Sequence, residues 1–301
     1  MGNDDLFCGN NSRLIEVKII EYIDHMKRNG KGYSTIHNYI ACVLAFYKIN
    51  DVALNVTKIN KFIPLQVKVK KDRAYTHEEI CKLLELADDR VRVMILLMAS
   101  SGIRAGAIPL LKLRNLEGNK ITVYEGEREE YFSFISPECK KAIEIYLDIR
   151  KRYGEELTQN SPLIREKFNT KDPFRVKKPK PLTMAMIKCT LIYLEQRLGL
   201  RTGEVAMTHG FRKFFTTQLI NSKVNPEIRE MLLGHKIGLT SSYYRPTEQE
   251  MYAEYEKSVN SLTINEENRL RRKIQKLEVE KTDYDTLAAE VASIKKRLSL
   301  G

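Results

Sequence analysis

Five residues stand in this sequence at spacings that could bring them together on a phosphate group. His209 and Arg212 lie three residues apart in H-G-F-R, so the start of a helix would place both on one face, where they could converge on one phosphate. Arg104 ends the motif S-G-I-R, His235 ends L-L-G-H, and Tyr244 follows nine residues after His235. Taken singly, each has an ordinary structural explanation: a surface arginine, a core histidine or a half-buried tyrosine.

Glycines and apolar segments are placed so that they would present these residues at helix ends. A strongly apolar helix is predicted directly before S-G-I-R, and Gly102 permits a tight turn there. Arg104 then stands at the start of the next helix, where free amide groups favour an anion. Gly234 is predicted to end another helix and to present His235 beyond it. The H-G-F-R motif stands just before a helix predicted over residues 213–220.

The predicted fold class is mainly α-helical, with a small antiparallel β-hairpin sheet. Alternating apolar residues predict strands over residues 120–124 and 131–135, and the charged turn E-G-E-R-E-E joins them. Helical periodicity dominates elsewhere. The predicted divisions are a helical domain over residues 1–65, a basic linker over 66–74, a mostly helical domain over 75–258 and a C-terminal amphipathic, coiled-coil-like helix over 259–301.

The C-terminal segment carries apolar residues mostly three and four positions apart, with charge almost everywhere else. They are Leu270, Ile274, Leu277, Tyr284, Leu287, Val291, Ile294 and Leu298. Lys281 interrupts this seam, and its phase shifts near residues 284–287. The pattern fits either a short oligomerising coiled coil or a single amphipathic helix folded back on its own domain.

Charge and composition favour an intracellular protein that binds a polyanion. The chain has 301 residues and a formal charge of +12, from 51 basic and 39 acidic residues, which favours nucleic acid as the partner. No run of apolar residues is long enough to span a membrane, and the polar start is not a signal peptide. The five cysteines form no Cys-x-x-Cys motif, so neither a zinc site nor a disulfide framework is predicted. We expect a cytoplasmic protein associated with the nucleoid.

Taken in order, the motifs resemble the catalytic domain of the tyrosine recombinases, the phage-type integrases. That signature has an early arginine, then His-x-x-Arg, then Gly-His, and a tyrosine nine residues later, as do Arg104, His209 with Arg212, His235 and Tyr244 here. The flanking phrases S-S-G-I-R-A-G-A-I-P-L-L-K-L and M-L-L-G-H-K-I-G-L-T-S-S-Y-Y resemble the family as well, the second being similar to archaeal integrases. The resemblance covers roughly residues 74–258, and the preceding helical domain is similar to the family's DNA-gripping core-binding domain.

The resemblance implies a site-specific recombinase that cuts and rejoins double-stranded DNA. Tyr244 would attack the scissile phosphate, form a 3′-phosphotyrosyl link and release a 5′-hydroxyl, with no metal, ATP or other cofactor. Arg104 and Arg212 would stabilise the developing oxyanion, because guanidinium groups bind phosphate oxygens bidentately and stay charged. His209 and His235 could donate hydrogen bonds or exchange protons near neutral pH.

Two positions depart from the family pattern or are ambiguous. Relatives carry a general-acid lysine in the hairpin turn, where this chain has only Arg128, a reluctant proton donor. Either Arg128 takes its place as a phosphate contact, or Lys120 or the pair Lys177–Lys178 supplies the proton. Tyr243 is the rival nucleophile. Adjacent helical residues point about 100° apart, so only one can face the phosphate, and the spacing favours Tyr244.

Several basic residues are candidates for contacts with the DNA backbone. They are Lys68, Lys70, Lys71 and Arg73 in the linker, and Lys177 and Lys178 in a basic segment over residues 165–180, which is predicted to be a loop. The family acts as a tetramer on two DNA sites, so we expect self-association. Two other functions stay open: a DNA-binding protein with an inactive site, and an enzyme similar to type IB topoisomerases that relaxes supercoils without a specific site.

Overall fold

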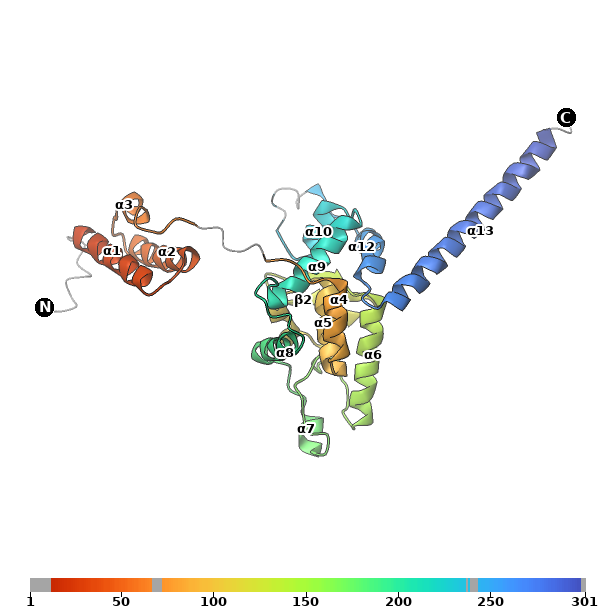
Figure 1. Ribbon diagram of the computed structural model, residues 1–301, viewed down its shortest axis with the longest axis horizontal. Coiled ribbons are helices and arrows are strands. Elements are labelled where there is room, and N and C mark those ends of the chain that lie inside the picture. Colours follow the sequence, from red (N-terminus) through yellow and green to blue (C-terminus); the bar gives the residue numbers. More distant parts are fainter. Residues whose placement is uncertain (1–11, 67–71, 237, 239–242, 299–301) are drawn as a thin grey trace. The chain divides into compact units, whose positions relative to one another are not determined.

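A small helical unit and a larger, mainly helical unit with one sheet make up the chain (Figure 1). The computed structural model describes residues 12–66, 72–236, 238 and 243–298. The two units are Met1–Lys71 and Asp72–Gly301, so the division falls inside the predicted linker. The predicted fold class is confirmed, because helices dominate both units and the sheet is small and antiparallel.

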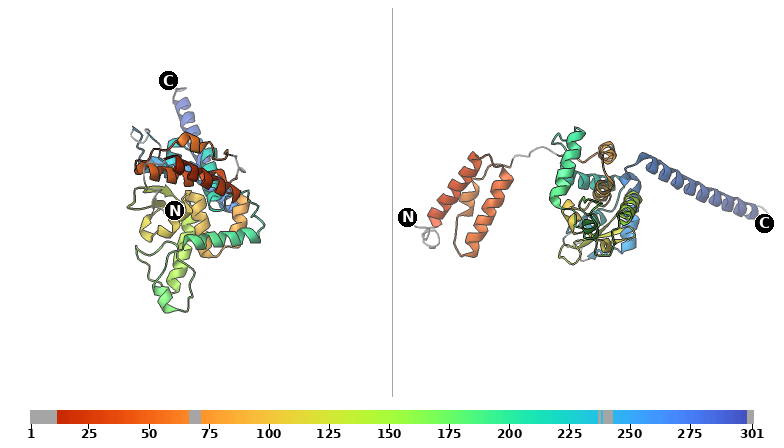
Figure 2. Two further views of the ribbon diagram at one scale, coloured as in Figure 1. Left: turned by 90° about the vertical axis from the view of Figure 1, so that its left-hand side faces the viewer. Right: turned by 90° about the horizontal axis from the view of Figure 1, so that it is seen from below.

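The first unit consists of α1 (Ser12–Arg28), α2 (Tyr33–Ile49) and the short α3 (Val56–Asn60). Helices α1 and α2 lie side by side, as the right-hand view of Figure 2 shows. Glu16 on α1 accepts hydrogen bonds from the backbone N–H of Asn55 (2.8 Å) and from Lys58 Nζ (2.9 Å). These bonds tie α3 to α1. The buried core of this unit consists of Ile15, Ile19, Ile23, Met26, Ile36, Ile40 and Ile59.

The second unit is built around α5 (Asp89–Ser101), a helix with ten buried residues. It packs against α6 (Pro137–Arg152) and α9 (Met207–Asn221), between which it lies in Figure 1. A helix that is apolar on all sides is stable only when other elements cover it. The S-G-I-R motif begins at the last residue of α5, so its position is set by the most buried helix of the unit.

Local capping signals fix where many of these helices begin. Thr76 and Glu79 form the capping box of α4 (His77–Glu85), each side chain accepting a backbone N–H of the first turn. Side chains also cap three further helices of the second unit, whereas α9 has no side-chain cap. These helices are α8 (Met184–Arg197, capped by Thr183), α10 (Pro226–Leu232, capped by Asn225) and α12 (Glu248–Leu262, capped by Thr247).

The sheet has three strands in the order β1–β2–β3, all antiparallel. The predicted hairpin is present as β2 (Lys120–Val123) and β3 (Tyr131–Phe134), each one residue shorter than expected. Val123 pairs with Tyr131 at the end of the hairpin that leads into the charged turn. The short β1 (Leu116–Glu117) adds the third strand, which the sequence did not predict. It follows the 3-10 helices η2 (Ala105–Leu110) and η3 (Leu113–Asn115).

The basic segment over residues 165–180 contains a short helix where only a loop was predicted. Helix α7 (Pro173–Lys177) begins after Asp172, whose side chain accepts the N–H groups of Phe174 (3.1 Å) and Arg175 (3.3 Å). An aspartate followed by proline is a helix-start signal, and it outweighs the basic charge that indicated a loop. We call residues 165–180 the basic arm, and α7 lies apart from the core helices in Figure 1.

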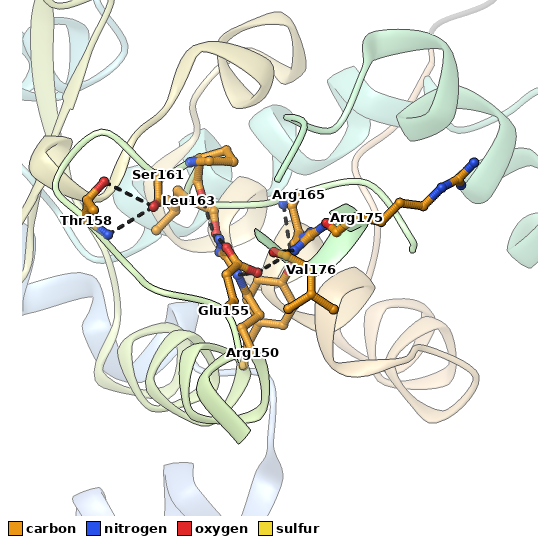
Figure 3. A network of polar contacts seen from close by, with 10 residues as sticks. Arg150, Glu155, Thr158, Ser161, Leu163, Arg165, Arg175 and Val176 are labelled. Carbon is orange, nitrogen blue, oxygen red and sulfur yellow. Dashed lines mark hydrogen bonds and ion pairs between the residues drawn. The ribbon is translucent and has the colours of Figure 1, made fainter. Parts of the chain in front are cut away.

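A buried ion-pair network holds the base of the basic arm (Figure 3). Glu155 lies between Arg150 and Arg165 and pairs with both guanidinium groups, and all three side chains are almost wholly buried. Arg165 also donates to the carbonyl oxygens of Val176 (3.2 Å) and Arg175 (2.6 Å) at the far side of the arm. The negative charge of Glu155 is therefore paired with two guanidinium groups, as the burial of a charged group requires.

The C-terminal helix α13 (Glu266–Leu298) begins after Asn265, which caps it by accepting the N–H of Asn268 at 3.0 Å. Glu138 on α6 accepts the N–H groups of Ile264 (2.7 Å) and Asn265 (3.0 Å) and so anchors the start of this helix. Apolar side chains of the predicted seam are about half exposed, as for Ile274 and Leu277. Within the described ranges, no helix combines the length and apolar character that crossing a bilayer requires.

Candidate active site

Arg212 is the most buried of the predicted site residues and joins two helix ends. It lies on α9 at 6% exposure, and its Nη1 donates to the carbonyl oxygen of Gly102, the residue that ends α5. Its Nη2 donates to the carbonyl of Leu233, which ends α10. The last carbonyls of a helix lack partners within the helix and carry partial negative charge. One guanidinium therefore satisfies a carbonyl at the ends of α5 and α10.

His235 lies directly beside Arg212. Its Nε2 is 2.8 Å from Arg212 Nη2, and its Nδ1 is 2.6 Å from a carboxylate oxygen of Glu230. Burial would raise the pKa of Glu230, but hydrogen bonds from His235 and Arg229 outweigh it, so the pKa lies below its usual value. The Glu230 carboxylate, which the sequence analysis missed, is therefore charged at neutral pH and faces a predicted site residue.

His209 and Arg212 share one face of α9, as their spacing predicted, but inside the helix rather than before it, since α9 begins at Met207. Both line an open hollow of about 520 Å³. Burial, followed by the positive charges of Lys213 and Arg212, lowers the pKa of His209. The hollow is also lined by Asp72, Ala74, Lys213, Thr216, Thr217, Glu230, Leu233 and His235.

Arg104 lies exposed at the cap of η2, next to the left-handed Gly102 that ends α5. Burial lowers the pKa of Arg212, and the charge of Arg104 lowers it further, so the two guanidinium groups are close enough to act on each other. Like charges held together without a partner oppose each other. This arrangement favours an anion between or beside the two arginines.

Tyr131 is a second residue that the sequence analysis missed. Its ring packs on Gly234, where an added Cβ would come within 2.5 Å of the ring, and Gly234 has the left-handed φ of +65°. The Tyr131 hydroxyl is buried. Burial raises the pKa of Tyr131, and the charges of Arg212 and Arg104 oppose the shift, which places the hydroxyl beside the two arginines.

The structure does not bring Tyr244 into this cationic group. Burial raises the pKa of Tyr244, and the carboxylates of Glu250, Glu254 and Glu227 raise it further. Tyr244 packs against the hydrophobic core, whereas the neighbouring Tyr243 is 91% exposed. In this arrangement the phenol is surrounded by negative charge rather than by the positive charge that would activate it.

The candidates for the missing hairpin lysine lie in different places. Arg128 is exposed in the turn after β2. Lys120 lies at the start of β2 and forms ion pairs with Glu248 (2.8 Å) and Glu117 (3.5 Å). Its ammonium group would have to leave these carboxylates before it could contact a phosphate. Lys177 and Lys178 are exposed on the basic arm, where Lys178 Nζ lies 4.6 Å from the centre of the Phe174 ring.

The predicted backbone contacts in the linker are only partly described. Lys68, Lys70 and Lys71 lie outside the described residues. Arg73 is held by Glu79, with contacts of 2.6 and 2.8 Å, and by Glu204 at 3.5 Å. A phosphate contact by Arg73 would have to replace these ion pairs. Among the described residues, no group of three or more His, Cys, Asp or Glu side chains is placed to hold a metal ion.

Comparison with known proteins gives a consistent result. A model described as the phage integrase family matches residues 73–250. The tyrosine recombinase XerC of Lactobacillus leichmannii is 24% identical over 234 residues, which cover 74% of this chain and 75% of that protein. The tyrosine recombinase XerA of Pyrococcus horikoshii is 24% identical over 247 residues, covering 79% of each chain.

Solved structures show the same fold. The Tn1549 transposon integrase in complex with a circular intermediate DNA aligns with a TM-score of 0.58 at 18% identity, covering 80% of this chain and 84% of that one. A lambda integrase dimer bound to a COC′ core site aligns with a TM-score of 0.53 at 16% identity, covering 77% of this chain and 64% of that one.

Proposed function

This chain belongs to the phage integrase family and is a tyrosine recombinase, and on that premise we propose how it acts on DNA. The proposal is that it cleaves and rejoins double-stranded DNA at a specific site through a covalent link to Tyr244, without metal or ATP. The observation that carries it is the convergence of His209, Arg212 and His235 on one open hollow, with the charge of Arg104 acting on Arg212 and His209.

The proposed chemistry needs positive charge beside the phosphate, because the phosphate gains negative charge in the transition state. In the transfer, a bond forms between Tyr244 Oη and phosphorus, and the bond from phosphorus to the 5′-oxygen breaks. Arg104 and Arg212 would hold the extra negative charge of the five-coordinate phosphorus, an interaction stronger in the transition state than in the ground state. The phenol gives up its proton and the 5′-oxygen takes one up. The reverse attack by a 5′-hydroxyl restores the strand.

The proposal requires Tyr244 to leave its carboxylate neighbours before it reacts. Glu250 and Glu254 belong to α12 and Glu227 to α10, so the phenol would have to move away from both helices and toward the arginines. DNA could provide the driving force, because its phosphate neutralises the arginines and replaces the repulsion between them by attraction.

We also propose that the helical domain over residues 1–65 and the catalytic domain over 75–258 both contact DNA. Contacts to the backbone would come from Lys68, Lys70, Lys71 and Arg73 in the linker and from Lys177 and Lys178 in the basic arm. The DNA complexes of the Tn1549 and lambda integrases support DNA as the partner. We further propose a tetramer on two sites, which would act in the cytoplasm on nucleoid DNA.

The test is trapping of a covalent protein–DNA adduct. Fragments of the source genome, nicked so that the released strand diffuses away, would be incubated with wild type, Tyr244→Phe and Tyr243→Phe, and adducts read on a denaturing gel. An adduct lost only in Tyr244→Phe supports the proposal. An adduct lost only in Tyr243→Phe would identify Tyr243 as the nucleophile instead. Bound DNA without any adduct would indicate an inactive site, and relaxation of every plasmid would indicate a topoisomerase-like enzyme.

A further inference from the structure

Backbone geometry at the end of α10 brings Glu230 and His235 together. The N–H of His235 donates to the carbonyl oxygen of Glu230 (2.9 Å), and the N–H of Gly234 donates to that of Met231 (2.8 Å). Gly234 has a φ of +65°. This is the Schellman motif, in which a left-handed residue turns the chain back over the last helical turn. The motif places the residue after the glycine directly beside Glu230, whatever their side chains.

The side chains then make a contact that only one form of neutral His235 satisfies. Arginine has only donors, so in the 2.8 Å contact between Arg212 Nη2 and His235 Nε2 the imidazole nitrogen must accept. The neutral ring therefore carries its proton on Nδ1, which donates to the Glu230 carboxylate at 2.6 Å. The partners thus assign the tautomer: an unbroken chain of donors runs from Arg212 through His235 to Glu230.

Glu230 lies at a position in α10 where a negatively charged side chain is unfavourable. It lies in the last turn of α10, whose carbonyl groups carry partial negative charge, so a negative side chain there is unfavourable. Its oxygens face His235 and Arg229, and it lines the same hollow as His209 and Arg212. A carboxylate at this position is unfavourable for α10 but contacts His235. The contact with His235 therefore explains the position of Glu230 better than helix stability does.

We propose that Glu230 is a positioning residue that holds His235 with its Nε2 lone pair facing Arg212, and through His235 orients the guanidinium that binds the scissile phosphate. The role in catalysis rests on the proposed function, whereas the tautomer does not. In this tautomer of the free protein Nε2 accepts the hydrogen bond of Arg212.

Two variants separate this role from a merely structural one. Glu230→Gln keeps an oxygen that accepts the Nδ1 proton, and Glu230→Leu removes it. We expect Glu230→Leu to slow single-turnover adduct formation about tenfold to hundredfold, which is the loss seen when the carboxylate partner of a metal-binding histidine is removed. Glu230→Gln should restore most of the rate, because its side-chain oxygen still accepts the Nδ1 proton.

A double-mutant cycle tests that Glu230 acts through His235. If it does, Glu230→Leu slows adduct formation in the wild type but causes no further loss in His235→Ala. Equal losses in both backgrounds would overturn the proposal, as would a wild-type rate for Glu230→Leu.

Nitrogen-15 NMR of the ring supplies a readout that needs no DNA. Protonated and unprotonated ring nitrogens resonate far apart, so the spectrum of free wild type should show His235 protonated on Nδ1, and Glu230→Leu should lose that preference. A proton on Nε2 in the wild type would overturn the proposal. Absence of any adduct with the expected Nδ1 signal would instead count against the proposed function and leave the tautomer standing.

Discussion

The guanidinium of Arg212 and the carbonyl oxygen of Gly102 are joined by a hydrogen bond of 2.6 Å between residues 110 positions apart. A second bond from the same guanidinium reaches Leu233, so one side chain ties the ends of α5 and α10 to α9. A residue proposed to bind the scissile phosphate is thus also part of the buried framework. Arg104, its proposed partner in catalysis, is exposed and has no such bonds among those described.

Replacing each arginine by methionine should separate these two roles. Arg212→Met leaves the carbonyls of Gly102 and Leu233 buried without donors, and each such group costs about 1–3 kcal/mol, so we expect a loss of about 2–6 kcal/mol in the free energy of unfolding. Arg104→Met should change stability by about 0.5 kcal/mol or less. Both should abolish adduct formation. Urea unfolding of the two variants provides the measurement, and equal stabilities would contradict the framework role of Arg212.

Two left-handed glycines offer a matched test of how closely Tyr131 packs. Gly118 and Gly234 have φ values of +61° and +65°, but an added Cβ meets nothing within 4 Å at Gly118, whereas at Gly234 it meets the Tyr131 ring. Gly118→Ala should cost about 1–2 kcal/mol for the left-handed backbone alone. Gly234→Ala should cost about 1–3 kcal/mol more for the overlap. Thermal unfolding of both would reveal the difference, and similar melting temperatures would show that Tyr131 moves aside freely.

The pKa of His209 should depend on the charged side chains that surround it. Burial, then Lys213 and Arg212, and to a smaller extent Arg104, lower its pKa, and only Asp72 opposes them. We expect its NMR titration midpoint to lie below the usual value of about 6.5. Lys213→Met should raise the midpoint, because it removes one cation and frees the Asp72 carboxylate that Lys213 binds. A midpoint at or above the usual value in the free protein would show that the hollow does not repel a proton.

The same shift links stability to acid pH. An unfolded chain binds a proton at His209 as the pH falls through about 6.5, whereas the folded chain does so only at lower pH. The contribution of His209 to stability is therefore complete above that pH and is lost as the pH falls toward the folded-state pKa. His209→Gln should flatten this part of the stability profile in urea unfolding measured from neutral to mildly acidic pH, and an unchanged slope would contradict the assignment.

The sequence predicted the features that depend on residues close together in the chain. The capping box at Thr76 and the β2–β3 hairpin depend on residues a few positions apart, and both are present. The glycine at 234 does end a helix and present His235. Helix spacing also put His209 and Arg212 on one face, although α9 begins earlier than expected. These features follow from local backbone geometry, which a sequence pattern describes directly.

Other features depend on contacts that a single sequence does not reveal. The surroundings of Tyr244 come from α10 and α12 together, so the spacing from His235 could not indicate three carboxylates. Tyr131 reaches the site only because β3 packs against α10. Glu230 did leave a signal: a carboxylate five residues before His235, with glycine between them, fits the capping geometry. Gly234 was predicted only to end the helix, so Glu230 was not recognised as the partner of His235.

The exposed lysines of the basic arm allow a test of DNA binding. Replacing both Lys177 and Lys178 by alanine should weaken binding equally on all sequences, and should reduce the slope of log affinity against log salt by about 2 if each neutralises one phosphate. Lys140 and Lys141, an adjacent pair on α6, provide the control, and their double alanine variant should keep the wild-type slope. Fluorescence anisotropy across a salt series measures both. An adduct rate that falls far more than binding would instead assign one arm lysine to proton transfer.

The apolar seam of α13 predicts a role in assembly rather than in binding one site. Truncation after Asn265 removes the seam but keeps the two N–H groups that Glu138 accepts, so the anchor on α6 stays intact. We expect fewer protomers in each DNA complex by light scattering, with single-site affinity nearly unchanged. Ile274→Ser with Leu277→Ser should have the same effect, because both side chains are about half exposed on the seam. Val279→Ser is the control, since Val279 is equally apolar and exposed but lies off the seam. An unchanged complex mass in the truncated chain would rule out the coiled coil, and a loss of stability instead would favour a helix that packs on its own domain.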